Sequence, residues 1–395
     1  MRGKVILVLS GDALSKVLLL LVNILLIRVL TVPDYAKFTL IFSVLMLGYQ
    51  LVCAAIERLY IADFEAFSPH ATRLLAVSVM FFGGVLVLYL YSSTTGTDLL
   101  LFLLGLTILS AYQFERIKFQ QQQRFRQFSG VELIKNGGWF FLVLGWGAYS
   151  GGATPLSALG SLFVAAGGGL IYMRLVAGRS LPSSNKSGPE NSLSTMLRKS
   201  SDVFLYTLLA ALMPYLPVFM VNLSGQNDTL ATYGAAMRYQ GIMGMLVYAL
   251  NSVYLPTISQ ASSCDEARSF AFRFYRTLPI AGLTACMAII GFSICIPYID
   301  GGRYPMTPYV FAVLAACGFL SLTSIPAVNQ LLAQRHYRQI LIAISSGIAV
   351  NWIVFVVLKG VFPMLGAALA SLAGYAVANS IIVYFGFRCF SRRPG

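Results

Sequence analysis

The chain has 395 residues, of which 57% are apolar and only 11% charged, and its formal net charge is +14. This composition excludes an ordinary soluble protein, in which about a quarter of the residues are charged. Apolar runs of about 20 residues, each long enough to cross a bilayer, follow one another and leave no room for a soluble domain. We therefore expect an all-α polytopic membrane protein.

The hydropathy pattern predicts about twelve transmembrane helices. In chain order the predicted spans are 7–30, 36–56, 74–92, 98–114, 131–149, 156–176, 202–222, 232–256, 276–298, 306–330, 339–358 and 362–386. Helices are expected because lipid offers no hydrogen-bond partner to free backbone groups, and the alternating strands of a membrane barrel are absent from the sequence. The first apolar run is also too long for a cleavable signal peptide.

A polar stretch rich in Ser, Pro, Gly and Asn divides the spans into two sets of six. It predicts an N-terminal six-helix bundle over 1–176, a cytoplasmic linker over 177–200 and a C-terminal six-helix bundle over 201–395. The halves resemble each other, since Tyr35 and Tyr233 each mark the entry to the second span of a half. Transporters use such internal repeats to place a substrate site where the repeats meet.

The excess positive charge follows the membrane topology. Nearly all Lys and Arg residues fall in alternate loops, which places both termini in the cytoplasm by the positive-inside rule. The exceptions on the other side are Arg28, Lys37, Arg303 and Lys359. The charge therefore indicates contact with anionic membrane lipids, and we expect no nucleic acid partner.

The sequence lacks the residues that enzyme chemistry or a cofactor requires. Its two histidines, His70 and His336, fall in predicted loops, and its six cysteines show no C-x-x-C spacing. We expect no enzyme activity, no cofactor, no metal site and, without a phosphate-binding loop, no ATP hydrolysis. A membrane glycosyltransferase or polysaccharide polymerase would share the hydropathy, but such enzymes usually carry acidic pairs or a large outer loop, and the outer loops here are short.

Several stretches resemble the polysaccharide transporter family, the O-antigen-type lipid-linked oligosaccharide flippases of the multidrug/oligosaccharidyl-lipid/polysaccharide exporter superfamily. They are "LLIRVLTVPDYAKFTLIFSVLML", "YGAAMRYQGIMGMLVYALNSVYLPTISQ" and "GAALASLAGYAVANSIIVYF". The first departs from the family pattern at Val32 and Ala36, where glycine is common. The resemblance implies two bundles around a central cavity that carries a polyprenyl-diphosphate-linked oligosaccharide across the bacterial inner (plasma) membrane, for surface polysaccharide such as lipopolysaccharide O-antigen.

An anionic diphosphate needs cations along its path, so the charges within the first span are candidates for substrate contact. Asp12 and Lys16 are four residues apart, share one helix face and can pair. In one interpretation Lys16 lines the cavity and meets the diphosphate, while Asp12 orients it or binds an ion. In the other the two form a neutralised pair near the cytoplasmic interface, where Lys16 reaches toward water.

Three further cations complete the predicted substrate-binding set. Arg238 lies within the eighth span and contacts the anion or reaches the outer interface. Lys37 lies at a related depth in the first half, so the two would form an outer positive station. Arg28 contacts substrate or anchors the end of the first span.

The sequence leaves a second function open, an ion-coupled small-molecule exporter of the multidrug type. A strongly cationic cavity would repel the small cations that such exporters carry. Under the flippase hypothesis the partners are the lipid-linked oligosaccharide and membrane lipids, with a polysaccharide polymerase and glycosyltransferases as further candidates.

Overall fold

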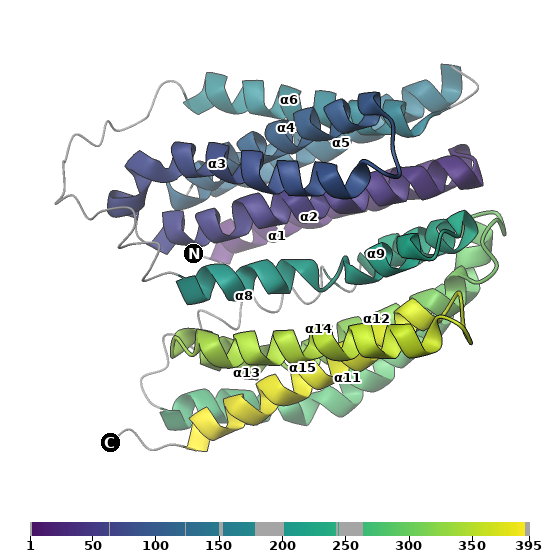
Figure 1. The fold of residues 1–395 in the computed structure, drawn as a ribbon. Coiled ribbons are helices and arrows are strands. Elements are labelled where there is room, and N and C mark those ends of the chain that lie inside the picture. The colour runs from purple at the N-terminus through teal and green to yellow at the C-terminus, as the bar shows by residue number, and fades with distance from the viewer. Residues whose placement is uncertain are drawn as a thin grey trace. The chain divides into compact units, whose positions relative to one another are not determined.

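The computed structural model describes residues 2–62, 64–122, 124–149, 153–177, 201–241, 244 and 264–391 (Figure 1). The described part of the chain is almost entirely helical, so the all-α prediction is confirmed. Contacts divide the chain into two compact units, residues 1–211 and 212–395. The predicted linker, 177–200, is outside the described residues except for its first residue, and the predicted boundaries of the two bundles stay a prediction.

Unit 1 is a bundle of long helices (Figure 1). They are α1 (Arg2–Val29), α2 (Val32–Ala62), α3 (Phe64–Leu90), α4 (Gly96–Gln121), α5 (Phe125–Tyr149), α6 (Pro155–Ala177) and α8 (Ser201–Leu212). The first six match the six predicted spans in order, and several run past the predicted ends. At 1.5 Å per residue, α1 to α6 are longer than a hydrocarbon core of about 30 Å, whereas α8 is shorter. The ends of α1 to α6 therefore reach the interfaces.

Unit 2 contains shorter and interrupted helices. They are α9 (Leu216–Leu223), a helical stretch at 227–241, α11 (Cys264–Ile299), α12 (Thr307–Thr323), α13 (Ile325–Ala333), α14 (Tyr337–Leu358) and α15 (Gly366–Ser391). The predicted tenth span is bent by 47° between α12 and α13, next to Pro326. The predicted seventh span is interrupted between α8 and α9, next to Pro214 and Pro217. Proline removes a backbone donor, which explains both breaks.

Large apolar side chains cover outward faces of the helices. On α11, for example, Ile280 is 71% exposed, Leu283 67% and Met287 66%. A water-facing surface would not carry such a stripe, whereas a lipid-facing one requires it. Among the described residues, seven helices are long and apolar enough to span a membrane, and nine spans result if each bent pair counts as one. The chain is a multi-pass membrane protein.

Two glycines bring α14 and α15 into direct backbone contact. A Cβ at Gly347 would lie 2.7 Å from the carbonyl oxygen of Gly374, and one at Gly374 would lie 2.6 Å from the carbonyl oxygen of Gly347. Both distances are too short for any side chain. Gly366, Ala370 and Gly374 thus form the small-residue face that lets membrane helices approach closely, as their spacing of four predicts.

Candidate functional site

In unit 1, α1 and α5 are joined at the level of Lys16 by buried polar contacts. The Ser15 hydroxyl donates to the backbone carbonyl of Glu132 (3.1 Å), and the Asn136 amide donates to the Ser15 hydroxyl (2.8 Å) and carbonyl (3.2 Å). Ser15 and Asn136 are almost fully buried. These contacts fix the helix turn that carries Lys16, which is partly buried and interacts electrostatically with Glu132 and Lys135.

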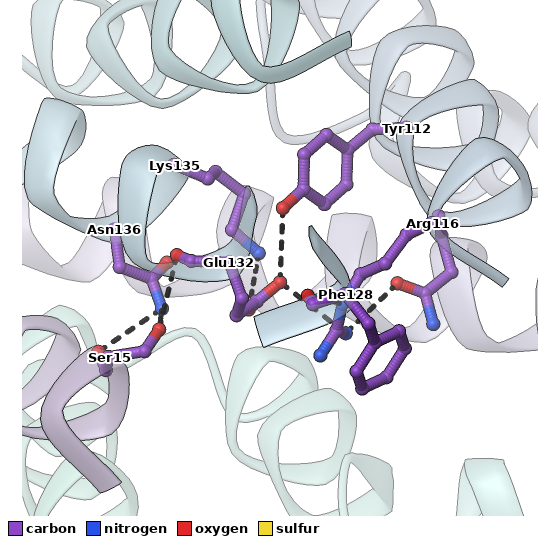
Figure 2. Close-up of polar contacts among 8 residues, drawn as sticks. Ser15, Tyr112, Arg116, Phe128, Glu132, Lys135 and Asn136 are labelled. Carbon is purple, nitrogen blue, oxygen red and sulfur yellow. Dashed lines mark hydrogen bonds and ion pairs between the residues drawn. The ribbon is translucent and has the colours of Figure 1, made fainter. Parts of the chain in front are cut away.

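Glu132 is the centre of a charged cluster that links α4 and α5 (Figure 2). Its Oε1 lies 2.7 Å from the Lys135 ammonium, and its Oε2 lies 3.4 Å from the Arg116 guanidinium. The Tyr112 hydroxyl donates to Oε2 over 3.2 Å. We call Lys16, Arg116, Glu132 and Lys135 the unit 1 cluster; its cations outnumber its one carboxylate.

Aromatic rings support the two cations that contact Glu132. Arg116 lies over the Phe128 ring, 4.0 Å from its centroid, and Lys135 lies 5.0 Å from the centroid of Tyr112. Cations stack favourably on aromatic faces, and such contacts strengthen where water is excluded. The rings thereby help to hold the cations beside the carboxylate.

Lys37 belongs to a separate ion pair in unit 1, between the starts of α2 and α4. Its ammonium lies 2.8 Å from Oδ2 of Asp98, whose side chain is 1% exposed, whereas the Lys37 side chain is 36% exposed. Asp98 Oδ2 also accepts the Thr95 hydroxyl (2.7 Å) and backbone N–H (3.0 Å). Lys37 therefore has a carboxylate partner, and its contact with substrate stays a prediction.

The two remaining candidates of the first span differ in how far they are described. Arg28 is exposed near the end of α1, in the last helical turn, where a cation also interacts well with the helix dipole. The side chain of Asp12 is outside the described residues, so its predicted pairing with Lys16 stays a prediction. Within the described part, the electrostatic partners of Lys16 come from α5.

In unit 2, Arg238 lies on the helical stretch 227–241 and is partly buried. It interacts electrostatically with Tyr215, which lies at the break before α9. Beside this break is a small pocket of about 20 Å³. Its lining residues are Met213, Pro214, Pro217, Tyr233, Met237, Gln240, Leu314, Cys317, Ser371 and Tyr375. Along the chain, Arg238 follows the pocket-lining residue Met237 and lies two positions before Gln240.

The sequence interpretation missed Arg116, Glu132 and Lys135 as a functional group. It assigned Arg116 and Lys135 to the cytoplasmic side and did not single out Glu132. A signal was present, since Glu132 and Lys135 are three residues apart at the start of a predicted span and so share a helix face. Their connection to α1 and α4 depends on helix packing, which a single sequence does not specify.

In the described ranges, no group of three or more His, Cys, Asp or Glu residues is placed to hold a metal ion. The charged groups that come together are mainly cations with carboxylate partners. Cations in excess of their carboxylate partners can hold an anion by charge and hydrogen bonding.

Comparison with known proteins decides the fold. The chain matches an inward-facing multidrug resistance MATE family transporter of the MOP superfamily over 95% of this chain and 94% of that one, with a TM-score of 0.68 and 11% identity. It matches the inward closed conformation of the lipid II flippase MurJ over 98% and 89%, with a TM-score of 0.64 and 12% identity. This chain has the fold of MATE transporters and MurJ.

A Vibrio cholerae MATE transporter is similar to the same extent, with a TM-score of 0.63 and 12% identity over 98% of this chain and 95% of that one. No protein-family model and no curated protein sequence matches the chain. The structural neighbours are transporters and a flippase. At 11–12% sequence identity, the likeness shows a shared fold. The narrower resemblance to O-antigen flippases stays a prediction.

Proposed function

We propose that the protein is a flippase that moves a polyprenyl-diphosphate-linked oligosaccharide from the cytoplasmic to the outer face of the bacterial inner membrane by alternating access. The observation that carries this proposal is the unit 1 cluster. Three cations, Lys16, Arg116 and Lys135, gather around the single carboxylate of Glu132. Charged groups in membrane helices are costly, and a surplus of one sign favours a ligand of the opposite sign.

The position of the cluster in the chain also supports this assignment. Arg116 and Lys135 belong to the cations that the positive-inside pattern assigns to the cytoplasmic side. A lipid-linked sugar assembled in the cytoplasm would meet the cluster on entry. Arg238 in unit 2, with Lys37 and Arg28 nearer the predicted outer ends of their spans, would supply the later contacts, and Asp12 an ion or pairing site.

A second candidate function is export of small molecules. MATE transporters are among the proteins with this fold, at TM-scores up to 0.68 among those named above. The two functions differ in the charge of the cargo. An exporter of organic cations is disfavoured by a cationic cluster, while an exporter of organic anions would use it equally well.

The experiment that tests the proposal is reconstitution in liposomes with a fluorescent polyprenyl-diphosphate oligosaccharide. Inner-leaflet substrate is expected to become accessible to a membrane-impermeant reagent faster than in empty liposomes, and Lys16→Ala is expected to slow this exchange. No acceleration with several oligosaccharides, with and without an ion gradient, would contradict the flippase assignment. Uptake assays with organic anions would then test the export alternative.

A further inference from the structure

The Glu132 side chain is less exposed than the side chains of the two cations that contact it. Its side chain is 7% exposed, compared with 15% for Lys135 and 12% for Arg116. All three side chains are thus largely buried, and those of the two cations are slightly more exposed than that of Glu132.

Three contacts of Arg116 are longer than a usual charge-assisted hydrogen bond to arginine. It lies 3.4 Å from Glu132 Oε2, 3.4 Å from the Phe128 carbonyl and 3.5 Å from Gln113 Oε1. Charge-assisted hydrogen bonds to arginine are typically about 2.7–2.9 Å. Its planar fork suits the oxygens of a phosphate, so a phosphate can form shorter bonds with Arg116 than these neighbours do.

Lys135 is held more closely, at 2.7 Å, but by a residue of its own helix three positions away. Its flexible four-carbon stem can swing the ammonium from Glu132 to another anion while the backbone of α5 stays in place. Lys16 completes the cationic side of the cluster from α1. Tyr49 on α2 interacts electrostatically with Glu57, Glu132 and Arg116, so Glu57 belongs to the same neighbourhood. The cations Lys16, Arg116 and Lys135 still outnumber the carboxylates of Glu132 and Glu57.

We propose that Glu132 is an internal counter-anion, which holds Lys135 and Arg116 until the substrate diphosphate takes them over. Glu132 then competes with the diphosphate throughout binding and keeps the affinity of the cluster for the diphosphate low enough for release. The inference rests on the proposed flippase function and adds Lys135 and Arg116 as diphosphate ligands. Transport requires this balance, since a site that binds too tightly does not let its cargo leave.

The test is equilibrium binding to the purified full-length protein in detergent, measured by calorimetry at fixed salt. The probe is farnesyl diphosphate, which carries the diphosphate and a short polyprenyl chain without sugar. Glu132→Gln removes the competing charge and is expected to tighten binding about tenfold, the equivalent of one charge-assisted hydrogen bond. Lys135→Gln is expected to weaken binding by about the same factor.

A matched control is available on α4. Lys118 and Glu115 form an ion pair with the same i,i+3 spacing and an N–O distance of 2.8 Å, outside the cluster. Glu115→Gln and Lys118→Gln are expected to leave the affinity within about twofold, since a pair within one helix contributes only a few tenths of a kcal/mol and this one lies outside the cluster. Equal effects from the control pair and the cluster pair would overturn the proposal.

If Glu132 only stabilises the fold, a different result is expected. Its loss would then loosen the cluster, and Glu132→Gln would bind the probe no better than the wild type. If Glu132→Gln does not fold, Glu132→Asp carries the test, because it draws the carboxylate back from Lys135 and is expected to tighten binding by a smaller factor. Unchanged or weaker binding by a folded Glu132 variant refutes the counter-anion role.

The two proposals fail in different ways. If the wild type flips lipid-linked sugar and binds farnesyl diphosphate, but a folded Glu132 variant does not bind it more tightly, only the counter-anion role is lost. If the wild type binds neither farnesyl diphosphate nor farnesyl monophosphate and flips no lipid-linked sugar, the flippase function is lost as well. Equal affinity for the two probes would assign the cluster to a single phosphate and overturn the diphosphate assignment.

Discussion

The Lys37–Asp98 pair offers a test that separates stabilisation from substrate contact. Lys37→Met removes the ammonium that lies 2.8 Å from Asp98 and leaves a carboxylate that is only 1% exposed. Breaking a fully buried pair costs about 3–5 kcal/mol, because an uncompensated charge remains. Here Lys37 is 36% exposed and Asp98 keeps two bonds from Thr95, so we expect a loss of about 1–2 kcal/mol in the free energy of unfolding.

The assay is a double-mutant cycle read by denaturant unfolding in detergent. Asp98→Asn added to Lys37→Met removes the stranded charge, and we expect the double variant to regain at least half of the lost stability. Lys118→Met is the control, because it breaks a contact of the same length between side chains that are 24% and 20% exposed. The expected loss there is below about 0.5 kcal/mol.

Transport by the same variants then decides the role of Lys37. If Lys37 contacts the substrate, the double variant regains stability but transports slowly. If Lys37 only balances Asp98, stability and transport return together. A Lys37→Met variant as stable as the wild type would refute the electrostatic reasoning itself.

Other perturbations give equally direct predictions. Gly347→Leu places a side chain against the Gly374 carbonyl and is expected to cost at least about 2 kcal/mol in unfolding free energy. Gly291→Ala, at an open position of α11, is expected to stabilise the protein by up to about 1 kcal/mol. Unfolding in detergent measures both changes. Trp139→Phe removes the indole N–H donated to the Ala158 carbonyl over 3.0 Å and should cost about 1 kcal/mol in the same assay. Arg238→Ala should slow liposome transport at least about tenfold at normal membrane abundance, since one charge-assisted contact is worth that much, and an unchanged rate would remove Arg238 from the site.

The sequence predicts the order of the helices well because apolar length is a local property of the chain. Its first six predicted spans correspond to α1 to α6, and the proline positions coincide with the interruptions before α9 and near α13. The small-residue face of α15 follows from a spacing of four. These features depend on residues that are close in the sequence.

The unit 1 cluster was not predicted because its members come from three helices. Lys16 was identified from its unusual position in an apolar run, yet its partners in the described structure are more than a hundred residues away. The Ser15–Glu132 and Ser15–Asn136 contacts show how that distance is bridged. A search for charged pairs at span ends would have found Glu132 and Lys135, but not the helix they face.

The break before α9 changes the backbone hydrogen bonding around Pro217. Pro217 has no N–H to donate to the carbonyl of Met213, four residues earlier, so that carbonyl needs another partner. The pocket of about 20 Å³ beside the break is large enough for one water molecule, and Gln240 and Ser371 bring polar groups to it. A water in this pocket would stay bonded to the backbone while the helix angle changes, so the backbone at the break would not be exposed to lipid.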